Sequence, residues 1–355
     1  MNVFADFHHA SLLNSLIMLF EGRLGGNVYR PIGMEWAERG FWGVYDHPAT
    51  QAQFLSLDQG YRPADGSPPL NLIKEVQDAS FDQPQVYYCR DIESDRTNKA
   101  ITFETFCDID IDIIIASVPQ HIEPFKRLIR LHKPNAKLIF QVGNSWTTEA
   151  FDAPNVMASA KVEGDVSNLN YVEYHQEFDL NVFRPNPLDY WWPEKEVNSF
   201  INVYQHFPDY PLFEEVERLM PDWKFNSFGG QCRDGSIPGS EKLAAKMREG
   251  MFGWHVKAGG DGFGHVLFNL AASGKPIITK KSYYAGTLGE KLMIDGETCI
   301  NIDNMPANEI KAAIEWFAEP KNYRQMCENV YANFREQVDF DADFEKIKAF
   351  IERLR

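Results

Sequence analysis

The sequence predicts an α/β protein made of two successive domains. Two series of apolar strands alternating with amphipathic helices run along the 355 residues, and such alternation is typical of doubly wound parallel sheets. Between the series, residues 181–194 carry prolines and no periodicity, so we expect the linker there. The second series holds a glycine-rich turn, residues 259–264, directly before a helical pattern. Such a turn points backbone amides at a bound anion.

The first series opens as a doubly wound domain does, with a strand, a helix and a second strand. Its expected elements are strands at 2–7, 28–31, 110–117, 137–141, 156–160 and 171–173, and helices at 12–23 and 122–131. Residues 35–85 show no clear period and are expected to form loops and short helices. His8 and His9 follow the first strand, at the edge where such sheets bind ligands. Either a ligand contact or ordinary capping bonds would explain them.

The second series repeats the pattern. Its expected elements are strands at 198–204, 224–228, 252–257, 277–279 and 298–302, and helices at 212–220, 241–249, 266–273 and 286–293. The tail from residue 308 is predicted to be helical, with breaks near Pro320 and Asp339. The predicted domains are residues 1–185 and 186–335, followed by a final helix at 336–355.

The glycine-rich turn is part of a longer block that reads G-G-D-G-F-G-H-V-L-F-N-L-A-A-S-G-K-P-I-I-T from residue 259 to 279. The block resembles E-G-F-G-x-x-x-x-E-A-x-A-x-G-x-P-V-I of nucleotide-sugar-dependent glycosyltransferases with the GT-B fold, notably the retaining family with the E-x7-E signature. Asp261 and Asn269 stand in place of its two glutamates. A plain βαβ turn would not need the downstream Gly-Lys-Pro, and a dinucleotide-binding loop would need G-x-G-x-x-G.

The resemblance implies two Rossmann-like α/β domains facing a cleft. The final helix would return to the N-terminal, acceptor-side domain, and the C-terminal domain would bind the donor, expected to be a UDP-sugar. Transfer would retain the anomeric configuration and need no obligatory cofactor. No D-x-D motif or His/Asp/Glu cluster stands beside the loop, so we also expect no metal.

The resemblance also assigns roles to single residues. Asp261 would accept hydrogen bonds from hydroxyls of the transferred sugar, and Asn269 would bind the ribose. Backbone groups facing sugar and phosphate would come from Gly260, Gly262, Phe263, Gly264 and His265. Gly229 lies where such folds pass the nucleotide base. His8 or His9 would approach from the opposite domain as the cleft closes.

The family's phosphate-binding Arg and Lys are missing from their usual place, where the sequence reads Tyr-Gln-His-Phe at 204–207. Lys257, on the predicted strand that feeds the loop, is our preferred substitute, and Arg233 and Lys280 are further candidates. His255 should share the strand face of Lys257, although a core histidine is the simpler interpretation. Lys257 and Asp261, with His8 or His9, are therefore the predicted catalytic residues.

Composition narrows the function. The net charge of −16 argues against a generally basic nucleic-acid-binding surface. The cysteines are scattered, odd in number and without a C-x-x-C pair, which favours reduced thiols over a disulfide framework or a zinc site. No apolar run approaches the roughly 18 residues of a membrane span. We therefore expect a cytoplasmic protein.

Three functional classes stay open at this stage. The first is a glycosyltransferase. The second is another nucleotide-sugar enzyme, such as a 2-epimerase, which needs further acid–base carboxylates. The third is a non-catalytic sugar-nucleotide-binding module, suggested by the replaced glutamates. The acceptor could be a small metabolite, a glycan precursor, or a hydroxymethylated DNA base as in phage DNA glycosyltransferases.

Overall fold

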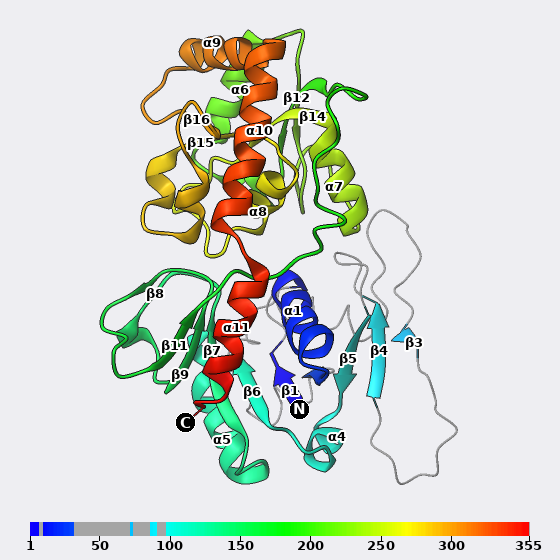
Figure 1. Cartoon of the computed structure of the whole chain (residues 1–355), viewed down its shortest axis with the longest axis vertical. Coiled ribbons are helices and arrows are strands. Elements are labelled where there is room, and N and C mark those ends of the chain that lie inside the picture. Colours follow the sequence, from blue (N-terminus) through cyan, green and yellow to red (C-terminus); the bar gives the residue numbers. More distant parts are fainter. Residues whose placement is uncertain (7–9, 32–71, 74–85, 91–96, 355) are drawn as a thin grey trace. The chain divides into compact units, whose positions relative to one another are not determined.

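The computed structural model describes residues 1–6, 10–31, 72–73, 86–90 and 97–354 (Figure 1). The chain divides into two compact units, the first formed by Met1–Phe178 with Phe340–Arg355 and the second by Asp179–Asp339. Strand β6 (Ile113–Ala116) belongs to the sheet of the first unit, and β15 (Ile277–Thr279) to that of the second. The prediction of two α/β domains with separate sheets is therefore confirmed.

Among the described residues, the sheet of the first unit has the order β11-β9-β7-β6-β1-β2-β5-β4-β3. The strands are β1 (Asn2–Ala5), β2 (Asn27–Pro31), β3 (Leu72–Ile73), β4 (Val86–Arg90), β5 (Thr97–Ile101), β6, β7 (Lys137–Val142), β9 (Asn155–Ala158) and β11 (Asn170–Glu173). All pairs are parallel except that β4 runs antiparallel to β3 and β5. Strand β3 lies in the stretch 35–85, which we expected to form loops and short helices. Its two residues are too few to show the alternation of apolar and polar side chains that identifies a strand in a sequence.

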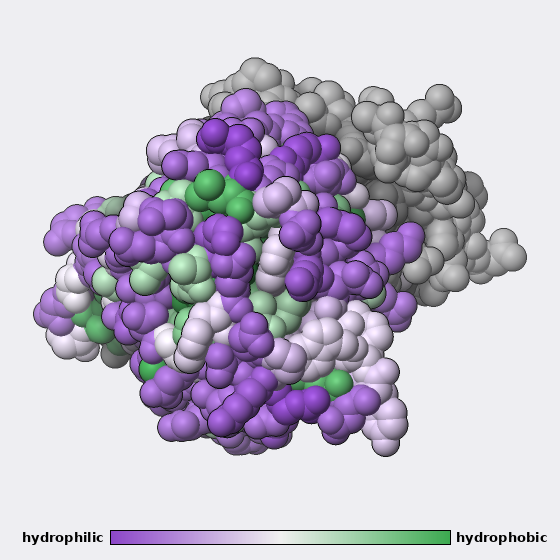
Figure 2. Space-filling model, turned by 90° about the horizontal axis from the view of Figure 1, so that it is seen from above, coloured by the Kyte–Doolittle hydropathy of each residue, from purple (hydrophilic) through white to green (hydrophobic). Residues whose placement is uncertain are grey.

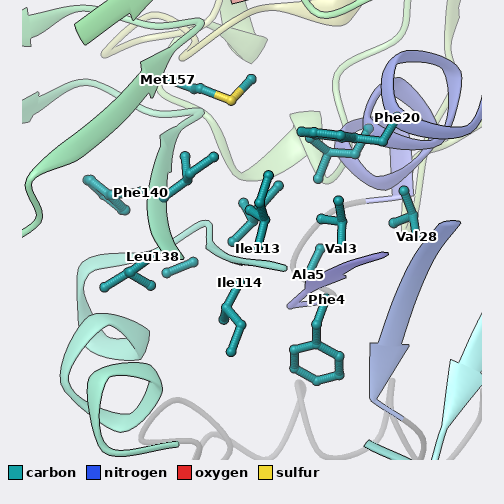
Figure 3. Close-up of a cluster of buried hydrophobic side chains, with 14 of the residues drawn as sticks. Val3, Phe4, Ala5, Phe20, Val28, Ile113, Ile114, Leu138, Phe140 and Met157 are labelled. Atoms are coloured by element: carbon teal, nitrogen blue, oxygen red, sulfur yellow. The ribbon is translucent and has the colours of Figure 1, made fainter. Parts of the chain in front are cut away.

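The core of the first unit lies on both faces of this sheet. Residues Val3–Ala5 of β1 and all of β6 are continuous buried apolar runs, as expected for parallel strands that are covered on both sides. Phe4 packs edge-on against Phe106 of α4 (Phe103–Asp108), with ring centroids 4.9 Å apart. Figure 3 shows Val3 and Ile113 pointing the opposite way, toward Phe20. The alternation along β1 thus fills two layers of core.

The helix predicted at 12–23 has two parts. It begins as α1 (Ala10–Ile17) and continues as a π-helix, η1 (Met18–Arg23). Leu24 N–H donates to the carbonyl of Leu19 at 3.1 Å, which is the i→i−5 bond of the wider turn. The face of the sheet opposite α1 is covered by α4 and by α5 (Ile122–His132), since Phe4 packs against Phe106 and Phe125. The short turn η2 (Pro119–His121) connects β6 to α5.

The final helix, α11 (Phe340–Ile351), is part of the first unit. Asn170 of β11 donates to the carbonyl of Phe350 at 3.2 Å. Buried Asp343 accepts from the backbone N–H and from Nδ1 of His175, at 2.9 and 2.7 Å. Burial raises the pKa of Asp343, but the hydrogen bonds from His175 and Lys346 hold it below its usual value. These contacts fix α11 to the edge strand.

Residues 181–194, predicted as the linker, lie within the second unit. The units meet at 178/179 and 339/340, whereas the predicted boundaries were 185/186 and 335/336. Phe183 is buried, and the carbonyl of Val182 accepts from Arg248 at 2.7 Å. The prolines do exclude regular structure, but Leu188 between them packs against the core of the second unit.

The sheet of the second unit is parallel, with the order β13-β12-β14-β15-β16. Its strands are β12 (Glu194–Ser199), β13 (Lys224–Ser227), β14 (Gly250–Trp254), β15 and β16 (Cys299–Asn301), and its α-helices are α6 (Tyr210–Leu219), α7 (Ser240–Glu249), α8 (His265–Ala272), α9 (Ala307–Ala318) and α10 (Pro320–Gln337). The helix predicted at 286–293 is only a short 3₁₀ turn, η6 (Leu288–Leu292). Strand β14 ends at Trp254, so Lys257 lies in the following loop and not on the strand.

The surface shown in Figure 2 is mostly hydrophilic, and its apolar residues form small separate groups. No helix in the described part of the chain is long and apolar enough to cross a membrane.

Lys275, after α8, is fully enclosed in the second unit. Its ammonium donates to the carbonyl of Gly250 at 2.8 Å and to the Tyr323 hydroxyl at 3.2 Å. It also lies 5.4 Å from the ring centroid of Trp191. Burial lowers the pKa of Lys275 to about 8. The folded state therefore disfavours the charged form of this side chain.

We predict that Lys275→Met changes the pH dependence of stability. The folded pKa of about 8 lies below the value of 10.5 for an ordinary lysine, so the cost of burying the charge is full below pH 8 and fades toward pH 10.5. A shift of this size corresponds to about 3 kcal/mol. In urea unfolding, the free energy of unfolding of the wild type should rise by about 3 kcal/mol relative to that of Lys275→Met between pH 7 and 10.5.

Lys311→Met is the matched control, because Lys311 is half-exposed and pairs with Glu315 on the surface of α9. The stability of this variant relative to the wild type should hardly change over the same range. A constant difference between the wild type and Lys275→Met would contradict the prediction.

Candidate functional site

The sheet of the second unit has a topological switch point between β12 and β14. From β12 the chain moves to β13 on one side, and later to β14 on the other side of β12. Open parallel sheets bind ligands outside the carboxyl ends of their strands at such a point. The loops that border it are residues 200–209, after β12, and residues 255–264, after β14.

The second of these loops is the glycine-rich turn, and it brings backbone close to backbone. Gly260 has φ of 71°, and a Cβ there would overlap the carbonyl oxygen of Tyr283. Gly264 is the N-cap of α8 with φ of 80° and provides no side-chain cap. The first turn of α8 contains no acidic residue. The helix N-terminus is therefore left to backbone amides and its positive dipole, which favour a bound anion.

Asp261 lies within this turn, held by two basic side chains. Its Oδ2 is 2.5 Å from Nε2 of His255, and its Oδ1 accepts a hydrogen bond from the Lys257 ammonium. The side chains of Asp261 and His255 are 12% and 2% exposed, whereas that of Lys257 is 32% exposed. Burial raises the pKa of Asp261, but the charges and hydrogen bonds of His255 and Lys257 hold it well below its usual range. Asp261 is therefore ionised at any ordinary pH.

Two polar atoms near the turn are buried without a hydrogen-bond partner among the described residues. They are the carboxamide oxygen of Asn269 and Nδ1 of His255. Asn269 belongs to α8 and is 7% exposed. An unsatisfied buried acceptor costs about 1–3 kcal/mol, so this oxygen is suited to accept a hydrogen bond from a hydroxyl group.

Solved structures share the fold of this protein over the whole chain. The Anabaena protein HepE, solved with UDP-glucose, is 13% identical, with 100% of each chain covered and a TM-score of 0.63. An alpha-glucosyltransferase, AGT, solved with UDP and a 13-mer DNA containing a HMU base, is 10% identical, with 99% of each chain covered and a TM-score of 0.61. The trehalose-6-phosphate synthase OtsA is 9% identical, with 100% of each chain covered and a TM-score of 0.58.

The chain has the GT-B fold. Its structural neighbours HepE, AGT and OtsA are glycosyltransferases of the GT-B type. No protein-family model matches the sequence, and no curated protein does either.

In the second GT-B domain, Lys280 shares the sheet edge with the glycine-rich turn. It follows β15, and its ammonium binds Asp209 at 2.6 Å and the Tyr283 hydroxyl at 3.4 Å. The buried Tyr284 lies beside His255, because its hydroxyl donates to the His255 carbonyl at 3.4 Å and the two ring centroids are 5.9 Å apart. Burial and the negative charge of Asp261 raise the pKa of Tyr284. Lys280 thus lies in the neighbourhood of Asp261, but it is already paired.

Arg233, the other predicted cation, has structural partners elsewhere in this domain. It binds Glu217 of α6 at 2.8 Å, Asp234 at 3.3 Å and the carbonyl of Phe225 in β13. Among the described residues, none of these contacts involves the glycine-rich turn. The structure therefore does not bring Arg233 together with Asp261 and Lys257.

Gly229 lies where the loops after β12 and β13 meet. Its φ is 145°, and a Cβ there would lie 2.8 Å from Cα of Asn202. Next to it, Val203 N–H donates to the carbonyl of Gly230 at 2.9 Å. Val203 has a left-handed φ of 53°, which is rare for a β-branched residue and often marks a functional site. The sequence gives no signal for this conformation.

In the first GT-B domain, His8 and His9 lie outside the described residues. The structure instead shows a buried polar cluster between β1 and β6, which the sequence analysis missed. Asp6 accepts from the Ser117 backbone N–H at 2.7 Å and from the Ser117 hydroxyl, and it lies 2.5 Å from Nδ1 of His121. Asp6 and Ser117 directly follow the ends of β1 and β6, which was the only signal available in the sequence, and His121 ends the short turn η2 that comes after β6. In the part of the chain that is described, no group of three His, Cys, Asp or Glu residues could hold a metal ion.

We predict that Gly260→Ala destabilises the protein more than Gly259→Ala. Both residues have a left-handed φ, 71° at Gly260 and 83° at Gly259, so an alanine at either position destabilises the folded state by about 1 kcal/mol. Only at Gly260 does the new Cβ meet a backbone carbonyl, that of Tyr283, whereas Gly259 has open space. Overpacking adds about 1–3 kcal/mol. Equal unfolding free energies for the two variants would show that the close approach of Gly260 to Tyr283 does not exist in solution.

Proposed function

We propose that this chain is a glycosyltransferase that moves a sugar from a UDP-sugar to an acceptor hydroxyl. The observation that carries the proposal is the glycine-rich turn at the switch point, which opens α8 without an acidic residue in its first turn. A nucleoside diphosphate suits this place because amides and the helix dipole favour negative charge. UDP is inferred because HepE and AGT were solved with it.

The proposed chemistry follows from the charge that develops on the leaving diphosphate. The Lys257 ammonium and the backbone amides of residues 262–265 would stabilise that charge as the glycosidic bond breaks. Asn269 would bind the ribose, since its carboxamide oxygen is a buried acceptor. Retention of configuration is inferred from the resemblance to the E-x7-E family. Independence from metal is inferred from the lack of a D-x-D motif beside the loop.

The acceptor would bind on the first GT-B domain, with His8 or His9 as contacts. A small metabolite or a glycan precursor is favoured over DNA because the net charge is −16. The DNA alternative is supported by the similarity to AGT, whose solved complex contains a HMU base. No disulfide joins the described cysteines, which favours a reducing compartment such as the cytoplasm.

A second candidate is a non-catalytic sugar-nucleotide-binding module. The observation that favours it is the engagement of both Asp261 oxygens by side chains of the protein itself. Such a module would bind UDP-sugar without hydrolysing or transferring it. A nucleotide-sugar epimerase would instead convert the donor without any acceptor.

We predict that UDP-glucose raises the melting temperature, because a ligand at 100 times its Kd stabilises the folded state by about 2.7 kcal/mol. Asn269→Ala should weaken donor binding by about 3- to 10-fold, the worth of one hydrogen bond. Asn329→Ala is the control, since Asn329 is a half-exposed residue of α10 that bonds Gln325 and the carbonyl of Glu297. Unchanged affinity in Asn269→Ala would remove Asn269 from the ribose site.

We further predict that turnover persists in EDTA and yields a product with the donor's anomeric configuration, read by NMR. Lys257→Ala should lower kcat by about 100- to 1000-fold, because one charge-assisted contact to the leaving group is lost. Activity that disappears in EDTA and returns with Mn²⁺ would reject the metal-free mechanism. An inverted product would reject retention, and donor binding without any turnover would favour the binding module.

A further inference from the structure

The environment of Asp261 differs from what a sugar-binding carboxylate requires. Each of its oxygens is already bonded, one to His255 and one to Lys257. Its side chain is 12% exposed, against 32% for Lys257. The part of this cluster that a ligand can reach most easily is therefore the ammonium and not the carboxylate.

The place of the carboxylate adds a second constraint. A Cβ on Gly264, the N-cap of α8, would lie 3.6 Å from Oδ2 of Asp261. A lone negative charge at this end of the helix would offset the positive potential of the helix dipole and would repel a diphosphate. With Lys257 and His255 bonded to it, the cluster is neutral when His255 is neutral and positive when His255 is protonated. Pairing thus makes an acid compatible with an anion site.

Lys257 also gains order from this pairing. A lysine in a loop has four rotatable side-chain bonds, and fixing them costs up to about 2 kcal/mol. Asp261 fixes the ammonium before any ligand arrives. His255 secures Asp261 in turn, because its own carbonyl accepts from the Thr279 hydroxyl at 2.8 Å, which anchors residue 255 to β15.

We propose that Asp261 is a positioning residue, which holds the Lys257 ammonium beside the N-terminus of α8 for the donor diphosphate. It does not bind the transferred sugar. This inference rests on the proposed function and gives each residue of the cluster a separate role. Lys257 contacts the diphosphate, Asp261 orients the side chain of Lys257, and His255 orients the side chain of Asp261.

UDP, which carries the diphosphate but no sugar, distinguishes the two roles of Asp261. Titration calorimetry would compare UDP and UDP-glucose binding to the wild type, Asp261→Asn, Lys257→Met and the double variant. Asp261→Asn should weaken both ligands by the same factor, about 10-fold, the worth of one charge-assisted hydrogen bond. In the double variant, the Asp261→Asn change should not weaken the binding of UDP or UDP-glucose beyond the loss caused by Lys257→Met alone, since the two residues act as one unit.

Lys311→Met is the matched control, because Lys311 also pairs with a carboxylate four residues later and its side chain is 35% exposed. Its UDP affinity should equal that of the wild type. If Asp261→Asn does not fold, Asp261→Glu serves in its place, and it should retain most of the UDP affinity because the ion pair survives.

Two results would overturn the inference and leave the proposed function standing. One is unchanged or tighter UDP binding in Asp261→Asn together with weaker UDP-glucose binding, which would identify a direct sugar contact. The other is additive losses in the double variant. A wild-type protein that binds neither UDP nor UDP-glucose would overturn the proposed function and the inference together.

Discussion

The parallel pairing of β12, β14 and β15 is the constraint on which the candidate site depends. Ser199 pairs with Trp254, and Trp254 pairs with Ile278, so the loops after these three strands leave the sheet at one level. The ladder continues into the loop, because His255 N–H donates to the carbonyl of Ile278 at 2.9 Å. The rigid sheet therefore determines where His255, and with it Asp261, is held. Side chains built on such an edge keep their geometry better than those on isolated loops.

Much of the fold was predictable, because parallel strands covered on both faces are short continuous apolar runs that stand out in a sequence. Ile113–Ala116 and Ile277–Thr279 are of this kind, and each was predicted as a strand within a few residues. The start of α8 was predictable for a different reason, since glycines before an apolar run mark a tight turn into a helix. Both signals are local.

The features that the sequence did not reveal depend on contacts between distant residues. Nothing near Asp6 indicates that Ser117 and His121 surround it, because the parallel register of β1 and β6 alone brings them together. The prolines of residues 181–194 suggested a linker, yet the hydrogen bond from Arg248 to the Val182 carbonyl and the packing of Leu188 fix that segment to the second unit. The role of Asp261 is a similar case: its place in the motif could be read, but its pairing with His255 and Lys257 could not.

The charge of the whole protein and the charge of the site need not agree. A net charge of −16 opposes an anionic ligand at long range, but charges on the surface are screened beyond about 8–10 Å at physiological salt. The electrostatic potential at the N-terminus of α8 is set within that distance, by the helix dipole and the ammonium of Lys257 beside it. Both Asp261 and Asp209 are near this edge, and each is bonded to a lysine. Buried acids in an anion site are tolerable only in this paired form, since an unpaired one would pay its desolvation cost and repel the ligand as well. For the proposed anion site, the ion pairs of the second domain are thus a condition of binding in an acidic protein.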